Sequence, residues 1–257
     1  MVLPIRTSYN PEEGGVPSRQ AVPFLQRIPV IFRRLHRFHQ MDFELALWQL
    51  TYLCIAPRRV YKHVYFHKQT KNTWARDDPA ILVLLAGCLT VSAMVWSIVY
   101  HFGLSKFIEV AFMMILRDFF LSGILISTLI WFIANRVLVS PPSHTSPTDT
   151  SIEWAYVFDV HTNAFFPFYL TLYLAQLFLL SLILRDNWVC LWLGNTLYFL
   201  AFAQYTYGIY VGLNALPFLI RSELFLAPLL PIFVAYIVSL LGFNVAKHAL
   251  RLYFGSI

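Results

Sequence analysis

The stretch AILVLLAGCLTVSAMVWSIVY, residues 80–100, decides the fold class of this chain. It holds no charged residue and is long enough, at about 1.5 Å per helical residue, to cross a hydrocarbon core about 30 Å thick. Because backbone inside a bilayer must satisfy its own hydrogen bonds, the run predicts a membrane-spanning helix. The composition of the chain agrees, since 58% of its 257 residues are hydrophobic and 12% are charged, against about 25% charged in soluble domains.

Four further apolar runs are about 20 residues long, the length of a membrane span, and show no strand-like alternation of apolar and polar residues. One lies at residues 115–134, in a longer helix beginning near Phe107, and the others lie at 164–184, 188–211 and 224–246. The sequence therefore predicts an all-α polytopic membrane protein with a bundle of five transmembrane helices over residues 79–257. A segment rich in Ser, Thr and Pro at 140–151 predicts a flexible loop inside this bundle.

The chain before the bundle divides into two segments. Residues 1–27 are rich in Pro, Gly and Ser and lack an apolar core with a cleavage site, which predicts a disordered tail and no cleaved signal peptide. Residues 28–78 predict a cytosolic basic, amphipathic, interfacial segment. Its first helix has apolar residues on one face and cations on the other, which suits either an anionic membrane surface or the protein's own core. Its second, capped by Asp42 and ended by Pro57, is too short to cross.

The distribution of charge predicts the orientation of the bundle. Of 19 Lys and Arg residues, 12 precede Asp78, and the loops at 135–163 and 212–223 add two more to that side, against four on the other. The positive-inside bias places the N-terminus in the cytosol, and five crossings then place the C-terminus in the lumen. The cations that we expect to contact the membrane or a partner are Arg33, Arg34, Arg37, Arg58, Arg59 and Lys62.

Two opposite charges, Arg117 and Asp118, stand side by side in the second span. A span of about 20 residues ending at Ala134 takes in both, roughly 3–6 Å inside the lumenal boundary. Arginine can reach the headgroups from there but aspartate cannot, and adjacent helical side chains point about 100° apart, so the two are not predicted to neutralise each other. The candidate intramembrane polar cluster comprises Arg117, Asp118, Gln176, Asn195 and Gln204.

Two interpretations of this cluster remain open from the sequence. Its members could form a hydrogen-bonded clamp between helices, or line a polar pathway for transport or for lipid. The fourth span favours tight packing, because Gly194, Ala201 and Gly208 recur every seven residues and Gly208 forms a G-x-x-x-G with Gly212. Small residues at such spacing let helices approach closely.

Catalytic and metal chemistry is not predicted. His36 with His39 and His63 with His67 have helical metal-ligand spacing, but the remaining histidines are scattered and no H-E-x-x-H is present. Asp159, His161 and nearby Glu153 could support acid–base chemistry, yet no nucleophile in a suitable setting accompanies them. We expect these groups to anchor a helix where it enters the membrane. No catalytic, cofactor-binding or metal-binding residue is therefore assigned, and the protein is predicted not to be an enzyme.

Three blocks of sequence resemble the uncoordinated-fifty (Gmh-type) family of eukaryotic Golgi multi-pass membrane proteins. They are FRRLHRFHQMDFELALWQLTYLCIAPRRVYKHVYFHKQTKNTWARDDPA from Phe32, EWAYVFDVHTNAFFP from Glu153, and GNTLYFLAFAQYTYGIYVGLNALPFL from Gly194. The resemblance extends from about Phe32 to His248. The motif residues in these blocks are Asp42, Trp48, Trp74, Arg76, Asp77, Asp78, Asp159, His161 and Asn163.

This resemblance implies a Golgi membrane protein with five spans and a cytosolic N-terminus. It also implies a role in vesicular transport: binding large Arf guanine-nucleotide exchange factors and helping membrane cargo, such as acetylcholine-gated receptors, reach the cell surface. RNA binding by the basic N-terminal segment and residence in the inner nuclear membrane are secondary expectations. The alternative from the residues themselves is a lipid scramblase or transporter whose groove is lined by Asp118, Gln176 and Asn195. The family supplies no catalytic residue to transfer.

Overall fold

The computed structural model describes residues 41–71, 73–139 and 151–255. Within these ranges the regular structure is helical, and the one strand-like contact is an isolated bridge between Val139 and Leu219. The all-α prediction is therefore confirmed for the described chain. The predicted tail at 1–27, the basic helix after it and almost all of the loop at 140–151 lie outside the described residues.

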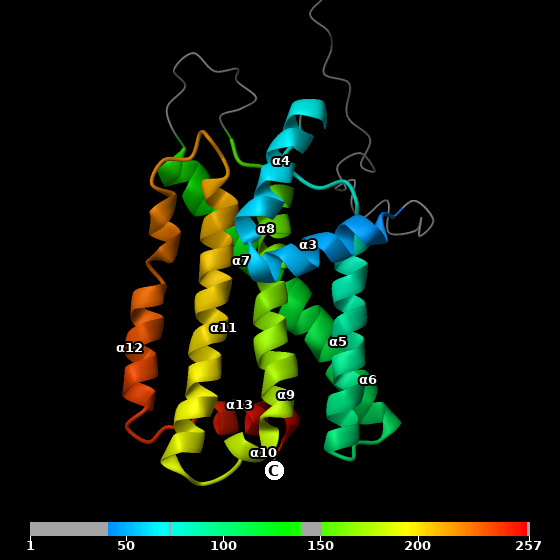
Figure 1. Ribbon diagram of the computed structural model, residues 1–257, viewed down its shortest axis with the longest axis vertical. Coiled ribbons are helices and arrows are strands. Elements are labelled where there is room, and N and C mark those ends of the chain that lie inside the picture. Colours follow the sequence, from blue (N-terminus) through cyan, green and yellow to red (C-terminus); the bar gives the residue numbers. More distant parts are fainter. Residues whose placement is uncertain (1–40, 72, 140–150, 256–257) are drawn as a thin grey trace, which may run out of the picture.

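One end of the molecule is built from α3 (Phe43–Ile55) and α4 (Pro57–Lys71). Asp42 begins α3 by accepting a hydrogen bond from the Leu45 amide at 2.9 Å, and Pro57 opens α4, where a missing N–H costs nothing. α3 lies across this end and α4 rises beyond it (Figure 1). Buried side chains of both helices pack against the first turn of α5, namely Ala46, Leu50, Leu53, Val60, Ala80 and Ile81.

Below this end, helical columns run side by side along the long axis (Figure 1). The first column is α5 (Ala80–Val99), and the second is the continuous run of α6 (Leu104–Phe112), η2 (Met113–Leu121), α7 (Ser122–Ile133) and η3 (Ala134–Leu138). The third is formed by α8 (Trp154–Tyr169), η5 (Leu170–Ala175) and α9 (Gln176–Phe178). The fourth is α11 (Trp188–Asn214), and the last is η6 (Ser222–Leu226) with α12 (Leu229–Ser239). Short α10 (Leu180–Ile183) precedes α11, and α13 (Val245–Phe254) lies across the far end of the bundle.

Membrane crossing is supported by length and composition for three helical segments in the described chain, Ala80–Val99, Leu104–Leu138 and Ser222–Ser239. The other two predicted spans, at 164–184 and 188–211, lie mostly in the columns α8–η5–α9 and α11. These columns are long enough, at roughly 37 and 40 Å, but more polar. α8 packs mainly against α11 and α7, and a continuous stretch of α8 from Tyr156 to Phe165 is buried. The polar residues of these two columns therefore face other helices. We expect such columns to be less uniformly apolar than helices that face lipid.

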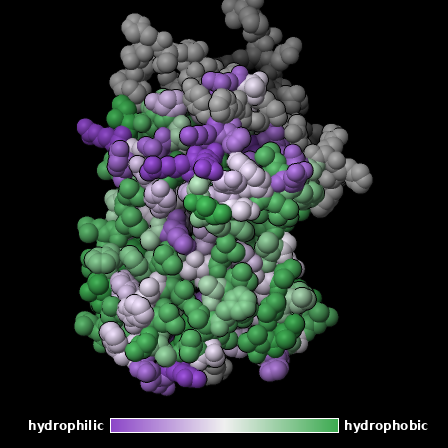
Figure 2. All heavy atoms as spheres, viewed as in Figure 1, coloured by the Kyte–Doolittle hydropathy of each residue, from purple (hydrophilic) through white to green (hydrophobic). Residues whose placement is uncertain are grey.

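The surface has the distribution of a membrane protein. Hydrophobic residues cover a broad middle band, and hydrophilic residues gather at the two ends, most densely at the α3–α4 end (Figure 2). Many large apolar side chains in the band are exposed, for example Leu125 at 62% and Leu129 at 59%. A soluble protein rarely exposes so extended an apolar surface, so this band is the part that faces lipid.

Close packing of α11 against α8 confirms what the spaced glycines predicted. A Cβ added at Gly208 would lie 2.8 Å from the Ala164 Cβ and 3.0 Å from its Cα. A Cβ at Gly212 would lie 2.5 Å from a Val160 methyl group. Because real Cβ atoms do not approach so closely, these glycines bring the two helices into contact along the centre of the bundle.

Candidate functional site

Two cavities lie on opposite sides of the middle of α8. The upper cavity, about 510 Å³, lies at the α3–α4 end and is lined by acidic and aromatic residues of the motif blocks. The lower cavity, about 590 Å³, lies among η2, α7, η5, α11 and α13 and is mainly aromatic. Among the described residues they share no lining side chain: Val160 lines the upper cavity and His161 the lower.

The loop between α4 and α5 is bound to α8 by two carboxylates. The amides of Trp74 and Ala75 donate to the two carboxylate oxygens of Glu153, each at 3.1 Å, and the Arg76 amide donates to Asp159 Oδ2 at 2.6 Å. Hydrogen bonds to ionised acceptors are roughly twice as strong as neutral ones. Three consecutive backbone amides are thereby fixed to a helix that begins about 80 residues later in the chain.

The side chain of Arg76 extends the same contact. Its Nη2 donates to Asn163 Oδ1 at 2.8 Å, and Asn163 Nδ2 donates to the Tyr61 hydroxyl at 3.3 Å. Asp159 is only 6% exposed and lies before the predicted span at 164–184. Burial raises its pKa to about 6, an effect that the charge and amide of Arg76 oppose. The motif residues Arg76, Asp159 and Asn163 therefore form one buried polar cluster, which we call the upper cluster.

Asp78 joins the starts of two helices beside this cluster. Its Oδ2 accepts from the Asp42 amide at 2.8 Å and its Oδ1 from the Ala80 amide at 3.0 Å. Asp77 lines the same cavity. Trp74 is buried against the rings of Tyr156 and Phe218, with ring centroids about 6 Å apart.

Two motif residues, Trp48 and His161, do not line the upper cavity. The ring of Trp48 packs on Tyr52 and His63, with centroids 4.5 and 4.9 Å away, at the outer surface of α3 and α4. His161 faces the lower cavity, with Nδ1 at 2.7 Å from the Tyr205 hydroxyl and Nε2 at 3.3 Å from the Phe119 carbonyl oxygen. Asp159 and His161 therefore do not meet in one pocket, as acid–base chemistry would need. The described residues also contain no cluster of His, Cys, Asp and Glu suited to a metal ion.

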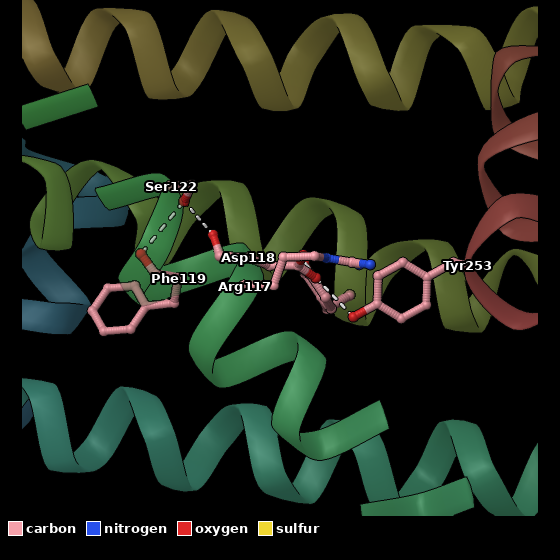
Figure 3. Close-up of polar contacts among 6 residues, drawn as sticks. Arg117, Asp118, Phe119, Ser122 and Tyr253 are labelled. Carbon is pink, nitrogen blue, oxygen red and sulfur yellow. Dashed lines mark hydrogen bonds and ion pairs between the residues drawn. The ribbon is translucent and has the colours of Figure 1, made fainter. Parts of the chain in front are cut away.

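Arg117 and Asp118 do pair, so the prediction that they would not neutralise each other is wrong. Arg117 Nε donates to Asp118 Oδ1 at 2.7 Å, and both side chains point toward Tyr253 of α13 (Figure 3). The hydroxyls of Tyr173 and Tyr253 donate to Asp118 Oδ2 at 2.9 and 2.7 Å. The Ser122 hydroxyl donates to the Asp118 carbonyl oxygen. The physical reason is Tyr253, whose hydroxyl binds Asp118 and whose ring lies 4.9 Å from the Arg117 guanidinium, so that both charged side chains meet at one residue of α13.

The other polar residues predicted to join Asp118 are dispersed. Gln176 lines the lower cavity but exchanges hydrogen bonds with the Tyr198 hydroxyl, at 3.3–3.4 Å. Gln204 accepts from the Thr171 hydroxyl at 2.8 Å. Asn195 turns to the other side of α11, where it contacts the α12–α13 turn. Gln204 and Asn195 thus fit the interpretation of a hydrogen-bonded clamp between helices. The single cluster of five residues is not formed, because each side-chain amide finds its hydrogen-bond partner on the nearest neighbouring element.

Sequence reasoning missed the tyrosines that satisfy Asp118. The polar cluster predicted from the sequence did not include Tyr173 or Tyr253, although a buried tyrosine hydroxyl needs a hydrogen-bond partner. Glu153 was recognised as a polar anchor, but its two amide contacts were not. The sequence did contain a signal for the tyrosine contacts. Few carboxylates occur within or beside the spans, so a tyrosine hydroxyl there has few acceptors other than Asp118.

The candidate cations of α4 form an exposed group. Arg58, Arg59 and Lys62 are exposed, while Val60 and Tyr61 between them are buried. The Arg59 guanidinium lies over the Tyr52 ring, 5.6 Å from its centroid. The remaining candidates, Arg33, Arg34 and Arg37, lie outside the described residues.

Comparison with known proteins gives a consistent result. Residues 31–254 match the UNC-50 family. The protein unc-50 homolog of Dictyostelium discoideum is 42% identical over 89% of this chain and 88% of its own length. The protein GMH1 homolog of Schizosaccharomyces pombe is 41% identical over 86% and 95%, and the unc-50 homolog of Homo sapiens is 44% identical over 82% and 81%. No solved structure matches the chain.

Proposed function

Because the chain belongs to the UNC-50 family, we propose that it is a non-enzymatic multi-pass membrane protein of the Golgi that acts in vesicular transport. Its α3–α4 end holds a soluble Arf guanine-nucleotide exchange factor at the cytosolic surface and so promotes the delivery of membrane cargo. The resemblance found in the motif blocks is confirmed by the family match. The exchange factor and the cargo are our extension from that resemblance.

The observation that carries this proposal is the fixed, cationic surface of α4. Arg58, Arg59 and Lys62 are exposed on a helix whose intervening residues are buried, and the loop after it is bound to α8 through Glu153 and Asp159. A surface that is already ordered loses little conformational entropy when a partner binds. Its positive charge suits an acidic partner that also approaches an anionic membrane.

We infer five crossings, and the orientation that this role requires follows from them. The columns α8–η5–α9 and α11 are long enough to cross, and α3–α4 and α13 lie at opposite ends of the bundle (Figure 1). With most cations on the α3–α4 side, the positive-inside bias favours a cytosolic N-terminus and a lumenal C-terminus.

Epitope tags at the two ends of the full chain should respond differently to permeabilisation. When only the plasma membrane is opened, the N-terminal tag should be stained; the C-terminal tag should be stained only after the Golgi membrane is opened as well. Both should coincide with a Golgi marker by fluorescence microscopy. Identical responses of the two tags would contradict an odd number of crossings, and staining of the nuclear rim would favour the inner nuclear membrane.

Reversing the charge of α4 should abolish capture of the exchange factor. We expect the full-length variant Arg58→Glu/Arg59→Glu/Lys62→Glu to recover at least tenfold less exchange factor than the unmodified chain in a detergent pull-down, because attraction becomes repulsion at three exposed positions. The fold should be unchanged, since these side chains are exposed.

The matched control carries the same change of charge at the opposite end of the bundle. Lys106→Glu/Arg185→Glu/Arg251→Glu should capture the exchange factor normally, because these positions lie at the far end from α4. Equal loss in both variants would refute a role for α4 itself. Nuclease treatment should leave capture unchanged; loss on treatment would instead support RNA binding by the basic segment.

A further inference from the structure

The lower cavity opens sideways onto the lipid-facing band. Leu121, Leu125 and Phe202 line it and are 51%, 62% and 43% exposed. Leu121 and Leu125 lie on the second column, which is among the helices apolar enough to cross a membrane. The mouth of the cavity therefore meets acyl chains, and water reaches it only at the level of the headgroups.

One end of this cavity carries a cation and the other end does not. Arg117 lines the cavity with its side chain 46% exposed, whereas the Asp118 side chain is 16% exposed and is covered by Arg117, Tyr173 and Tyr253. Nε of Arg117 is used by Asp118, which leaves donors on the terminal nitrogens of the guanidinium. The group that this ion pair presents outward is therefore the guanidinium of Arg117.

The cation lies at the depth at which a headgroup would lie. Tyr253, whose ring packs 4.9 Å from the Arg117 guanidinium, belongs to α13 at the end of the bundle. From Arg117 the second column runs inward past Leu121 and Leu125, about 6 and 12 Å further along the helix axis. The cavity wall is thus most polar beside the membrane boundary and mainly apolar toward the membrane centre, where His161 and Tyr205 are hydrogen-bonded to each other. This matches the layout of a phospholipid.

We propose that the lower cavity binds one membrane phospholipid, with its phosphate on Arg117 and one acyl chain along Leu121 and Leu125. Arginine suits this role because its planar guanidinium can donate two parallel hydrogen bonds to a phosphate. The aromatic wall supplied by Phe165, Phe168 and Phe202 gives a rigid apolar surface for the chain.

The site holds a lipid in place; no transport path across the bundle is required. His161, hydrogen-bonded to Tyr205, lies at the inner end of the lower cavity, and the upper cavity shares none of its described lining residues. Asn195, which a groove across the membrane was predicted to use, faces the α12–α13 turn instead. The inference does not depend on the exchange factor, because it concerns the opposite end of the molecule.

Native mass spectrometry of the full chain in detergent tests the proposal with three probes. Dioleoylphosphatidylcholine should bind as a single tight adduct. Dioleoylglycerol, which lacks the phosphate, and glycerophosphocholine, which lacks the acyl chains, should each bind at least tenfold more weakly. Arg117→Met should weaken phosphatidylcholine binding at least tenfold and leave dioleoylglycerol binding unchanged.

Two matched pairs of variants separate the site from general effects on the protein. Leu125→Trp fills the mouth and should weaken binding at least tenfold, whereas Leu129→Trp, one turn away and outside the cavity, should not. Arg251→Met at the same end should also bind normally. If Arg117→Met fails to fold, the comparison of Leu125→Trp with Leu129→Trp still tests the proposal. Equal binding of dioleoylglycerol, tight binding of glycerophosphocholine, or indifference to Leu125→Trp would overturn the proposal.

Discussion

Asp159→Ala should lower the free energy of unfolding by about 3 kcal/mol, because it removes a buried carboxylate on which the upper cluster depends. The Arg76 amide would lose its 2.6 Å acceptor, and the Arg76 guanidinium would lose a nearby opposite charge. For a chain of this size, the change corresponds to a melting temperature lower by about 6–12 °C. Circular dichroism of the detergent-solubilised chain during heating measures it.

The control substitutions distinguish the charge of Asp159 from its hydrogen bond. Asp159→Asn keeps an oxygen acceptor and should cost much less, while Glu109→Ala, at an exposed side chain paired with Lys106, should cost under about 1 kcal/mol. A loss for Asp159→Ala no larger than that for Glu109→Ala would contradict the role assigned to the upper cluster.

The raised pKa of Asp159 predicts a pH dependence with a definite sign. Because its folded pKa is about 6 and its unfolded value about 4, the folded state binds the proton more tightly. The part of the stability that depends on binding this proton is then fully present below pH 4 and is lost as the pH rises to 6. The stability of the unmodified chain relative to Asp159→Asn should therefore fall over this interval.

Gly208→Leu should destabilise the bundle by about 3 kcal/mol or prevent folding, because overpacking a close contact forces backbone apart. Even a Cβ at this position would lie 3.0 Å from the Cα of Ala164, which is backbone and has no rotamer by which to move away. The remaining atoms of leucine would have to enter the α8–α11 contact. Thermal unfolding and the yield of monodisperse protein in detergent report the effect.

Gly87→Leu is the matched control, since nothing lies within 4 Å of a Cβ built at Gly87, an exposed position on α5. Removing a glycine from a helix interior there should be neutral or stabilising by up to about 1 kcal/mol. Equal losses in the two leucine variants would show that the effect arises from insertion into the membrane and not from packing between α8 and α11.

Much of the architecture was predictable because a segment that crosses the hydrocarbon core must be apolar, helical and long enough to span it. The run at 80–100 had to be helical, and the short apolar stretch after Asp42 could not cross. The spacing of Gly208 and Gly212 predicted a close helix contact, and the structure shows it against α8. The sequence did not predict that the motif blocks would meet; the structure shows that Arg76, Asp78 and Asp159 line one cavity.

The parts that sequence did not predict depend on local geometry and on distant partners. Pairing of Arg117 with Asp118 accompanies their shared contact with Tyr253, which apolar patterning does not reveal. Tyr253 reaches Asp118 from 135 residues further along the chain. Asn195, Gln204 and Gln176 are all side-chain amides within apolar runs, yet each hydrogen-bonds a different part of the bundle. The partner depends on which helix lies nearby, and the residue type does not reveal it.

The attachment of residues 74–76 to Glu153 and Asp159 also sets an order of events during biosynthesis. The hydrogen bonds join positions 79, 78 and 83 residues apart, so the ribosome delivers the acceptors long after the donors. Until then the amides of residues 74–76 lack the carboxylate acceptors that they have in the folded chain. The α3–α4 surface is thus completed only once α8 has emerged, and a nascent chain stalled before that point would display an unfinished version of it.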